Sequence, residues 1–368
     1  KIVQYRPIFV PICVITLVVV YVQVKYTNEK RIFIESDEIF INKKEVLTQL
    51  QLENNILIGS NVLPGRQSHL NLDTSLFNDV SQGFKNQPIV TLFTSFKTNY
   101  AMDSEKVLVF NNTLYNWQTF REHVQLMLFT TETSAAEKVK FIGWNIFPIL
   151  HHSESGIPTI KSLFTQIKEL YNTYWYGYFN GDILLTEDIL ETLEYVSSVS
   201  DNFPNASILI IGRRINVLNV TSEEVRKING IKESARSRGS LYEIDAEDYF
   251  ITNKFFPWEK IPEFVIGRAG YDNWIVGLAR CDLGTIVIDA TESLTAVHQT
   301  TSKGGNKEGF AKVDKKHNLE LMQVLKLPKR FLQGLTTCAE WRTFRTIKTG
   351  QIELVKRDDL HKNCKCKK

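Results

Sequence analysis

Residues 174–212 hold two apolar runs separated by a helical pattern: YWYGYFNGD (174–182) and ASILIIG (206–212). Aromatic and β-branched runs of this length predict buried strands. Between them, Ile189, Leu193 and Val196 recur at helical spacing and form one apolar face. A strand, a helix and a strand in this order predict two parallel strands joined by a crossover helix.

The same alternation continues on both sides of this stretch. Further strands are expected in apolar runs upstream and downstream: 88–96, 124–130, 140–144 and 284–291. A helix containing Trp117, Phe120 and His123 is expected after the first run, and another helix begins at Pro158, where proline suits the first turn. The pattern predicts an α/β domain with a mainly parallel sheet and helices on both faces.

The composition is that of an ordinary globular chain, with 368 residues, 43% hydrophobic and 23% charged. A net charge of +3 gives no reason to expect a nucleic-acid partner. The mean hydropathy of −0.17 excludes a polytopic membrane protein but permits a single anchor. The chain contains no G-x-G-x-x-G and no G-x-x-x-x-G-K-S/T, which weakens a dehydrogenase or P-loop NTPase interpretation.

An anchor is expected near the N-terminus. Residues 7–24 (PIFVPICVITLVVVYVQV) carry no charge, and 18 residues is about the lower limit for a membrane-spanning helix. No small-residue cleavage site closes the run, so an uncleaved signal anchor is favoured over a cleaved signal peptide. We therefore expect residues 1–6 to form a short cytoplasmic tail and the polar residues 25–87 to form a stem.

Three N-x-S/T sequons, at Asn111, Asn205 and Asn219, favour a lumenal location for the rest of the chain. Besides Cys13 in the anchor there are four cysteines, which allow two disulfides in any of three connectivities: Cys281, Cys338, Cys364 and Cys366. The C-x-C pair near the end favours a disulfide or free thiols over a metal site, because no histidine cluster lies near it.

Polar residues follow the strand at 174–179. Asn180, Gly181 and Asp182 lie where ligands bind in open parallel sheets, beyond the carboxyl end of a strand. The Asp182 carboxylate suits Mg²⁺ or Mn²⁺ bridging a diphosphate. A plain turn is the alternative, because N-G-D is also good turn chemistry.

A second dense stretch spans residues 261–299. Asp272 opens a helical run, where it is either a helix cap or a rigidly held general base. His298 follows the strand at 284–291 and, paired with a carboxylate, would complete a nitrogen and oxygen ligand set for Mn²⁺.

Taken together, these stretches resemble nucleotide-sugar glycosyltransferases of the GT-A fold, over about residues 88–300. The motifs that carry the resemblance are short and occur in a specific order: Asn180-Gly181-Asp182, Gly212-Arg213-Arg214, Gly267 to Trp274, and Val287 to Gln299. The resemblance implies a catalytic domain over 88–330, with 331–368 as a C-terminal extension.

The resemblance also implies roles for individual residues. Asp182 and His298 would bind the metal, Mn²⁺ or Mg²⁺, and Asp272 would be the base of an inverting enzyme. Asn180 replaces the first aspartate of a D-x-D motif, which suggests a hydrogen bond to ribose or phosphate instead. The donor would be held by these and further residues: Thr94, Lys97, Asn180, Asp182, Arg213 and Arg268.

The resulting hypothesis is a single-pass type II membrane glycosyltransferase of the Golgi or ER. It would transfer a sugar from a nucleotide-diphosphate donor to a glycan or glycoprotein acceptor. Two alternatives are a lumenal nucleotide-sugar or glycan-binding protein without turnover, and an anchored adhesion protein whose motifs match by accident.

Overall fold

The computed structural model describes residues 88–368 except 97–103, 201, 302–312, 359 and 367–368. The predicted tail, anchor and stem, residues 1–87, lie outside the described residues. Within the part of the chain that is described, no helix combines the length and the apolar character needed to cross a membrane.

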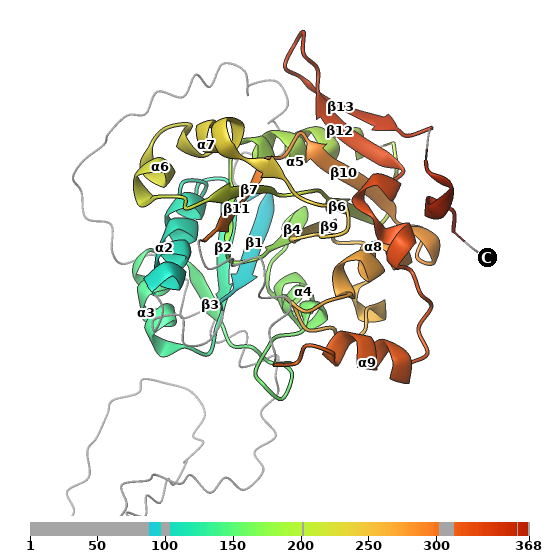
Figure 1. Cartoon of the computed structure of the whole chain (residues 1–368), viewed down its shortest axis with the longest axis horizontal. Helices are drawn as coiled ribbons and strands as arrows, with labels where there is room; N and C mark the ends of the chain where they lie inside the picture. The colour runs from blue at the N-terminus through green and yellow to red at the C-terminus, as the bar shows by residue number, and fades with distance from the viewer. Residues whose placement is uncertain (1–87, 97–103, 201, 302–312, 359, 367–368) are drawn as a thin grey trace, which may run out of the picture. The chain divides into compact units, whose positions relative to one another are not determined.

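In the described chain, nine strands form one sheet in the order β13-β12-β10-β6-β9-β4-β1-β2-β3 (Figure 1). Their bounds are β1 Val90–Ser95, β2 Val124–Phe129, β3 Asn145–Phe147, β4 Trp175–Phe179, β6 Ile208–Ile211, β9 Tyr249–Asn253, β10 Ile286–Glu292, β12 Trp341–Arg345 and β13 Ile352–Lys356. Most neighbouring strands pair in parallel. The exceptions are β9, which is antiparallel to both β4 and β6, and β13, which is antiparallel to β12. The prediction of a mainly parallel α/β sheet is confirmed.

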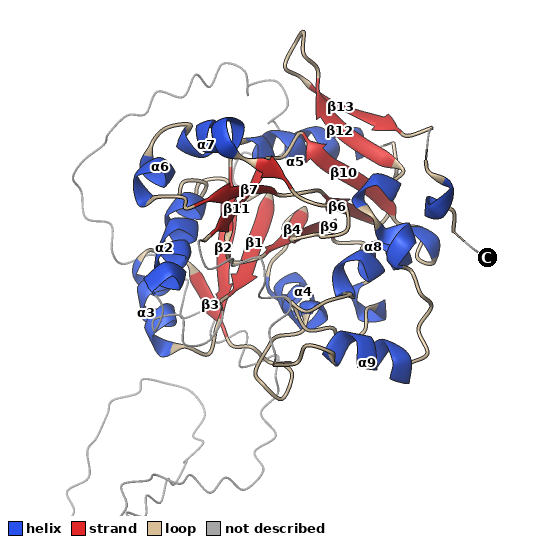
Figure 2. Ribbon diagram, in the orientation of Figure 1, coloured by secondary structure: helices blue, strands red, loops and turns tan. Residues whose placement is uncertain are grey.

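Helices cover both faces of this sheet (Figure 2). One hydrophobic cluster includes side chains of α2 (Ser104–Gln118), α3 (Thr133–Phe141) and α5 (Asp188–Ser200), and a second includes α4 (Ile160–Leu170) and α8 (Tyr271–Cys281). The two clusters lie on opposite faces because strand side chains alternate: on β1, Leu92 belongs to the first and Phe93 to the second.

A smaller sheet has the order β5-β11-β7-β8, with bounds Ile183–Leu185, Ala296–Thr300, Ile215–Leu218 and Ser240–Leu241. Strand β11 is antiparallel to β5 and parallel to β7. The remaining elements are α6 (Ser222–Arg226), α7 (Gly230–Arg238), α9 (His317–Val324) and the 3-10 turns η4 (Trp258–Lys260), η6 (Phe331–Gly334), η7 (Thr336–Cys338) and η8 (Lys362–Cys364).

Two local predictions in the first half of the domain need correction. The predicted strand at 140–144 is wrong, because α3 continues to Phe141 and β3 begins at Asn145. Ala135 and Val139 are both fully buried and lie four residues apart, so a helix buries this face. The helix containing Trp117 ends at Gln118, so Phe120 and His123 lie in the turn before β2 rather than in the helix.

Residues 331–368 add β12 and β13 to the edge of the main sheet. Two disulfides hold this segment, Cys281–Cys366 and Cys338–Cys364. The first ties the chain end to the last residue of α8, and the second closes a loop within the segment itself. This is one of the three connectivities that four cysteines allow.

Candidate functional site

The site lies where the order of the sheet reverses. The chain passes from β1 through α2 to β2 on one side, whereas β4 pairs with the other side of β1. In open α/β sheets this switch point, beyond the carboxyl ends of the strands, is where ligands bind. Thr94 lies near the end of β1, and Asn180 to Asp182 follow β4 directly.

Asp182 and His298 meet at this edge. The Nε2 atom of His298 lies 3.1 Å from Oδ2 of Asp182. The small sheet brings them together, because β11 pairs with β5 in a register that sets His298 opposite Ile183, the residue after Asp182. Burial favours a higher pKa for the Asp182 carboxyl, but His298 and then Arg214 outweigh it and the pKa is lowered. The Asp182 carboxylate is therefore charged at neutral pH.

Asn180 is engaged by neighbouring side chains. Its Nδ2 donates to Oδ1 of Asp248 at 2.7 Å, and its Oδ1 accepts from the Tyr178 hydroxyl at 3.0 Å. Arg214 also donates to Oδ1 of Asp248, at 2.5 Å, and its guanidinium stacks on the Tyr242 ring at 4.0 Å. In this structure the Asn180 amide therefore orients Asp248.

Asp248 and its neighbour Glu247 were not found from the sequence. They precede β9, and because β9 runs antiparallel to β4, its amino end lies at the carboxyl edge of the sheet. The backbone N–H of Asn180 donates to the Asp248 carbonyl at 2.9 Å, which fixes this placement. The aromatic run at 249–253 is a strand signal that would have exposed the two carboxylates, but only pairing reveals its direction.

Three buried polar atoms in this region have no hydrogen-bond partner among the described residues: Oγ1 of Thr94, Oδ1 of Asp182 and Oδ2 of Asp248. An unsatisfied buried polar atom costs about 1–3 kcal/mol, more when the group is charged. Native structures keep few such atoms, and those present call for an explanation such as a ligand, an ion or water. Their location at the switch point favours a ligand.

Asp272 lies in the first turn of α8. The N-cap is Gly270, which adopts the left-handed conformation (φ 93°), and the N-cap makes no side-chain hydrogen bond. Burial raises the pKa of Asp272 to about 7, with Asp248 and Asp245 adding repulsion and the Asn273 backbone N–H opposing it. A pKa of about 7 means that the protonation of Asp272 changes near neutral pH. The residue is half-buried, so water or a substrate can still reach it.

The other predicted donor-site residues differ in their contacts. Nε of Arg213 donates to the Tyr242 carbonyl at 2.7 Å. Arg268 donates to the Gly267 and Val313 carbonyls, at 2.7 and 2.8 Å. Both guanidinium groups thus donate to backbone carbonyls. The third predicted donor-site residue, Lys97, lies outside the described residues.

The three predicted sequons differ in exposure. Asn205 and Asn219 are exposed and adopt left-handed turns. Asn111 lies on α2, half-buried, and accepts a hydrogen bond from Lys138.

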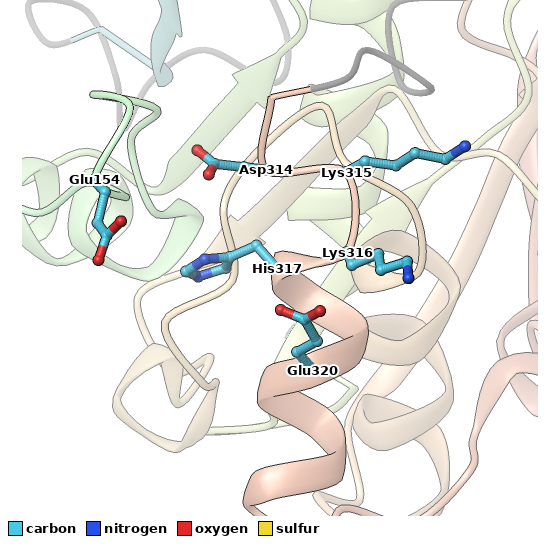
Figure 3. A pocket seen from close by; sticks show the side chains of 6 residues that line it. All are labelled: Glu154, Asp314, Lys315, Lys316, His317 and Glu320. Carbon is cyan, nitrogen blue, oxygen red and sulfur yellow. The ribbon is translucent and has the colours of Figure 1, made fainter.

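A cavity of about 540 Å³ lies at the start of α9 (Figure 3). Charged side chains of both signs line it: Glu154, Asp314, Lys315, Lys316, His317 and Glu320. In Figure 3 the His317 ring points toward Glu154, whereas Lys315 and Lys316 point away from it. None of the residues predicted from the sequence lines this cavity, so it is not part of the candidate site.

Across the described residues, no group of three or more His, Cys, Asp or Glu side chains is arranged to hold a metal ion. The Asp182 and His298 pair therefore offers two protein ligands. Mg²⁺ commonly binds through one or two carboxylates together with substrate phosphates. The pair fits a metal only if a phosphate-bearing substrate completes the coordination.

Comparisons with known proteins do not assign a family. No family model and no curated protein matches the chain. Among solved structures, TarS from S. aureus with UDP-GlcNAc has a TM-score of 0.36 at 11% identity, covering 64% of this chain and 65% of that one. Glucosyl-3-phosphoglycerate synthase from Mycobacterium tuberculosis has a TM-score of 0.36 at 8% identity, covering 73% and 87%.

A third similar structure is the inositol-1-phosphate CTP transferase from T. maritima, with a TM-score of 0.34 at 12% identity, covering 66% of this chain and 98% of that one. The present chain spans less than two thirds of the solved TarS chain. TM-scores of 0.34 to 0.36 are too low to support a conclusion about fold or function.

Proposed function

We propose that the chain is a glycosyltransferase of the GT-A type, which transfers a sugar from a nucleotide-diphosphate donor to a hydroxyl of a glycan or glycoprotein. One observation carries the proposal: the Asp182 and His298 pair at the switch point, with one Asp182 oxygen buried and unpartnered. A carboxylate held charged at this position fits a ligand that carries a cation or hydrogen-bond donors.

Divalent metal dependence is part of the proposal. Asp182 and His298 would hold Mn²⁺ or Mg²⁺ together with oxygens of the donor diphosphate. A bound cation would supply the positive charge that stabilises the leaving diphosphate. Asn180 and Arg214 contribute by fixing Asp248 beside this pair.

Asp272 is proposed as the general base. A base works best when its pKa lies near the operating pH, and the pKa of Asp272 is about 7. Its carboxylate would accept the proton of the acceptor hydroxyl as the new glycosidic bond forms. The first turn of α8 holds the carboxylate in place, and the α8 backbone is itself packed against η6.

A donor screen tests the proposal. The detergent-solubilised full chain is incubated with a panel of nucleotide sugars, with Mn²⁺ or with EDTA, and release of nucleoside diphosphate is measured. We expect one donor to be consumed only with metal, and Asp182→Asn to abolish this.

Asp282→Asn is the matched control, because both carboxylates pair with a basic side chain and both side chains are 33% exposed. The control should keep its activity. Equal losses in the two variants would contradict the assignment of Asp182.

A binding protein without turnover is the second candidate. One observation favours it. Position 180 is an asparagine whose amide donates to Asp248, so this position does not supply a second free carboxylate in addition to Asp182. Metal-dependent donor binding in the absence of any hydrolysis or transfer would support this alternative.

We also propose a lumenal location, with the N-terminal run at 7–24 as the anchor and the Golgi or ER as the compartment. Two disulfides support it, because disulfides persist in oxidising compartments and are rare in the cytosol. Exposed sequons at Asn205 and Asn219 are consistent with it.

A further inference from the structure

Asp248 is a buried side chain at the switch point whose two carboxylate oxygens differ. The residue is 6% exposed. Its Oδ1 accepts from Nδ2 of Asn180 at 2.7 Å and from Nη1 of Arg214 at 2.5 Å. Its Oδ2 has no hydrogen-bond partner among the described residues. A buried polar atom without a partner destabilises a fold, so Oδ2 indicates a group that the site binds.

The two donors to Oδ1 are themselves held in place. Nε of Arg214 donates to Oδ1 of Asn216 at 3.0 Å, and its guanidinium stacks on the Tyr242 ring. Oδ1 of Asn180 accepts from the Tyr178 hydroxyl at 3.0 Å. Because both donors are fixed against Oδ1, the carboxylate is oriented before a ligand binds and Oδ2 keeps a defined position.

Strand pairing and helix packing place Asp248 between the proposed metal ligands and the proposed base. On one side it accepts from Asn180, two residues before Asp182. Side chains alternate across β9, so Asp248 lies on the same face as Phe250, which belongs to the hydrophobic cluster of α8. The Phe250 ring centroid lies 6.1 Å from that of Tyr271, the residue before the proposed base. In the proposed reaction the transferred sugar occupies this interval, between the diphosphate and the acceptor hydroxyl.

A sugar hydroxyl is the group that fits Oδ2. A hydroxyl can donate to a carboxylate oxygen and can also accept from a carboxyl proton, so the fit does not depend on the protonation state of Asp248. A metal ion is not favoured there. In the described ranges no group of three His, Cys, Asp or Glu side chains is arranged to hold one, so Asp248 does not complete a metal site with Asp182 and His298.

We propose that Asp248 recognises the sugar of the donor: its Oδ2 forms a hydrogen bond with one hydroxyl of the transferred sugar, and Asn180 and Arg214 are positioning residues that hold the carboxylate. This inference rests on the proposed function, because it takes a nucleotide sugar as the ligand. It makes Asp248 a specificity-determining residue, since a sugar without this hydroxyl leaves a buried oxygen unpaired.

Binding of sugar analogues to the parent is the first test. The detergent-solubilised full chain is titrated by calorimetry, with Mn²⁺ present, against UDP, GDP, UDP-glucose, UDP-galactose, UDP-N-acetylglucosamine and GDP-mannose. The nucleotide sugar that binds is then compared with analogues that lack one sugar hydroxyl at a time. One analogue should bind about 10- to 100-fold more weakly, the range for a hydrogen bond to a charged group. Equal affinities for all analogues would overturn the proposal.

Asp248→Asn links this loss of affinity to the carboxylate. The variant keeps the size of the side chain, and its amide oxygen can accept from both donors of Oδ1, so a neutral NH₂ group takes the place of Oδ2. A charge-assisted hydrogen bond is roughly twice as strong as a neutral one. The variant should therefore bind the sugar about tenfold more weakly and lose most of its preference over the discriminating analogue. A preference equal to that of the parent would refute the proposal, whatever the change in stability.

Asp289→Asn is the matched control. Its side chain is 6% exposed, against 7% for Asp248, and it pairs with Arg357 as Asp248 pairs with Arg214. Both oxygens of Asp289 have partners, because Oδ1 accepts from Thr291 and Oδ2 accepts from Arg357. The control loses a comparable buried ion pair and should keep the preference of the parent among the analogues. The same loss of preference in both variants would show a general effect of a broken ion pair and would contradict the proposal.

The nucleotide without a sugar separates the two kinds of hydroxyl in the donor. Binding of UDP or GDP should be nearly the same in the parent and in Asp248→Asn, because neither probe carries the transferred sugar. If Asp248→Asn weakens the free nucleotide as much as the nucleotide sugar, Oδ2 binds a ribose hydroxyl and the proposal is wrong.

Turnover separates this inference from the proposed function. A donor that is consumed with the same preference among analogues in the parent and in Asp248→Asn would overturn the inference and leave the glycosyltransferase standing. Sugar binding that depends on Asp248, without hydrolysis or transfer, would support the inference and favour the binding protein. Failure of every probe to bind the parent would overturn the inference.

Discussion

Replacing Asp272 with asparagine should make the protein more stable and less active. The Asp272 carboxyl has a pKa of about 7 in the folded chain, mainly because it is buried in the first turn of α8. In the unfolded chain its pKa is near the ordinary ~3.9. The stability that this group contributes is therefore present below about pH 4 and is lost as the pH rises through about 7.

The size of the effect follows from the shift. Each pKa unit corresponds to about 1.4 kcal/mol, so a shift of about three units costs up to about 4 kcal/mol at pH 8 and about 1.5 kcal/mol at pH 5. Partial exposure of Asp272 to water reduces these upper limits. Asparagine has the same size, stays neutral and can still accept from the Asn273 backbone N–H, so the variant should recover most of this energy.

Urea unfolding of the parent and of Asp272→Asn at the two pH values measures the gain directly. In the transfer assay the same variant should lose about 10²–10⁴-fold in rate, the usual contribution of a general base, with donor affinity nearly unchanged. The parental kcat/KM should rise through pH 7 as the base loses its proton. A variant with parental transfer and the same stability at both pH values would refute the assignment of Asp272 as the general base.

Three further predictions concern the metal, the disulfides and the membrane. Asp182→Asn should abolish Mn²⁺-dependent donor binding, measured by calorimetry, with little change in Tm; a large fall in Tm with unchanged affinity would instead indicate a structural turn. Cys338→Ser together with Cys364→Ser should lower the free energy of unfolding by about 3.5 kcal/mol, the value expected for closing a loop of this length, and unchanged urea midpoints would contradict this. Glycosidase treatment of the cell-made protein should lower its apparent mass, and carbonate extraction should leave it in the membrane; an unglycosylated protein that cytosolic protease can cleave would exclude the lumenal proposal.

The strands of the main sheet were largely predictable from the sequence. β1, β2, β4 and β6 fall within predicted apolar runs, and β10 extends one residue beyond its run, to Glu292. These runs are rich in β-branched and aromatic residues because strands buried on both faces need such side chains along most of their length. The faces of α4 and α5 were equally clear from their helical spacing. The run at 140–144 misled because its residues belong to two different parts of the chain: Phe141 ends a helix that begins earlier and is 91% exposed, whereas Trp144 is buried just before β3.

The sequence by itself determined the parallel α/β layout and the short polar segments that end its strands, because both follow from local periodicity and turn chemistry. Only the tertiary structure decided which carboxylates meet. Asp182 reaches His298 through the register of β5 and β11, and Glu247 and Asp248 reach the same edge because β9 runs antiparallel. Thr336 reaches Glu247 because η6 packs on α8. Strand direction, register and helix packing depend on contacts between distant segments, and no local pattern in the sequence specifies them.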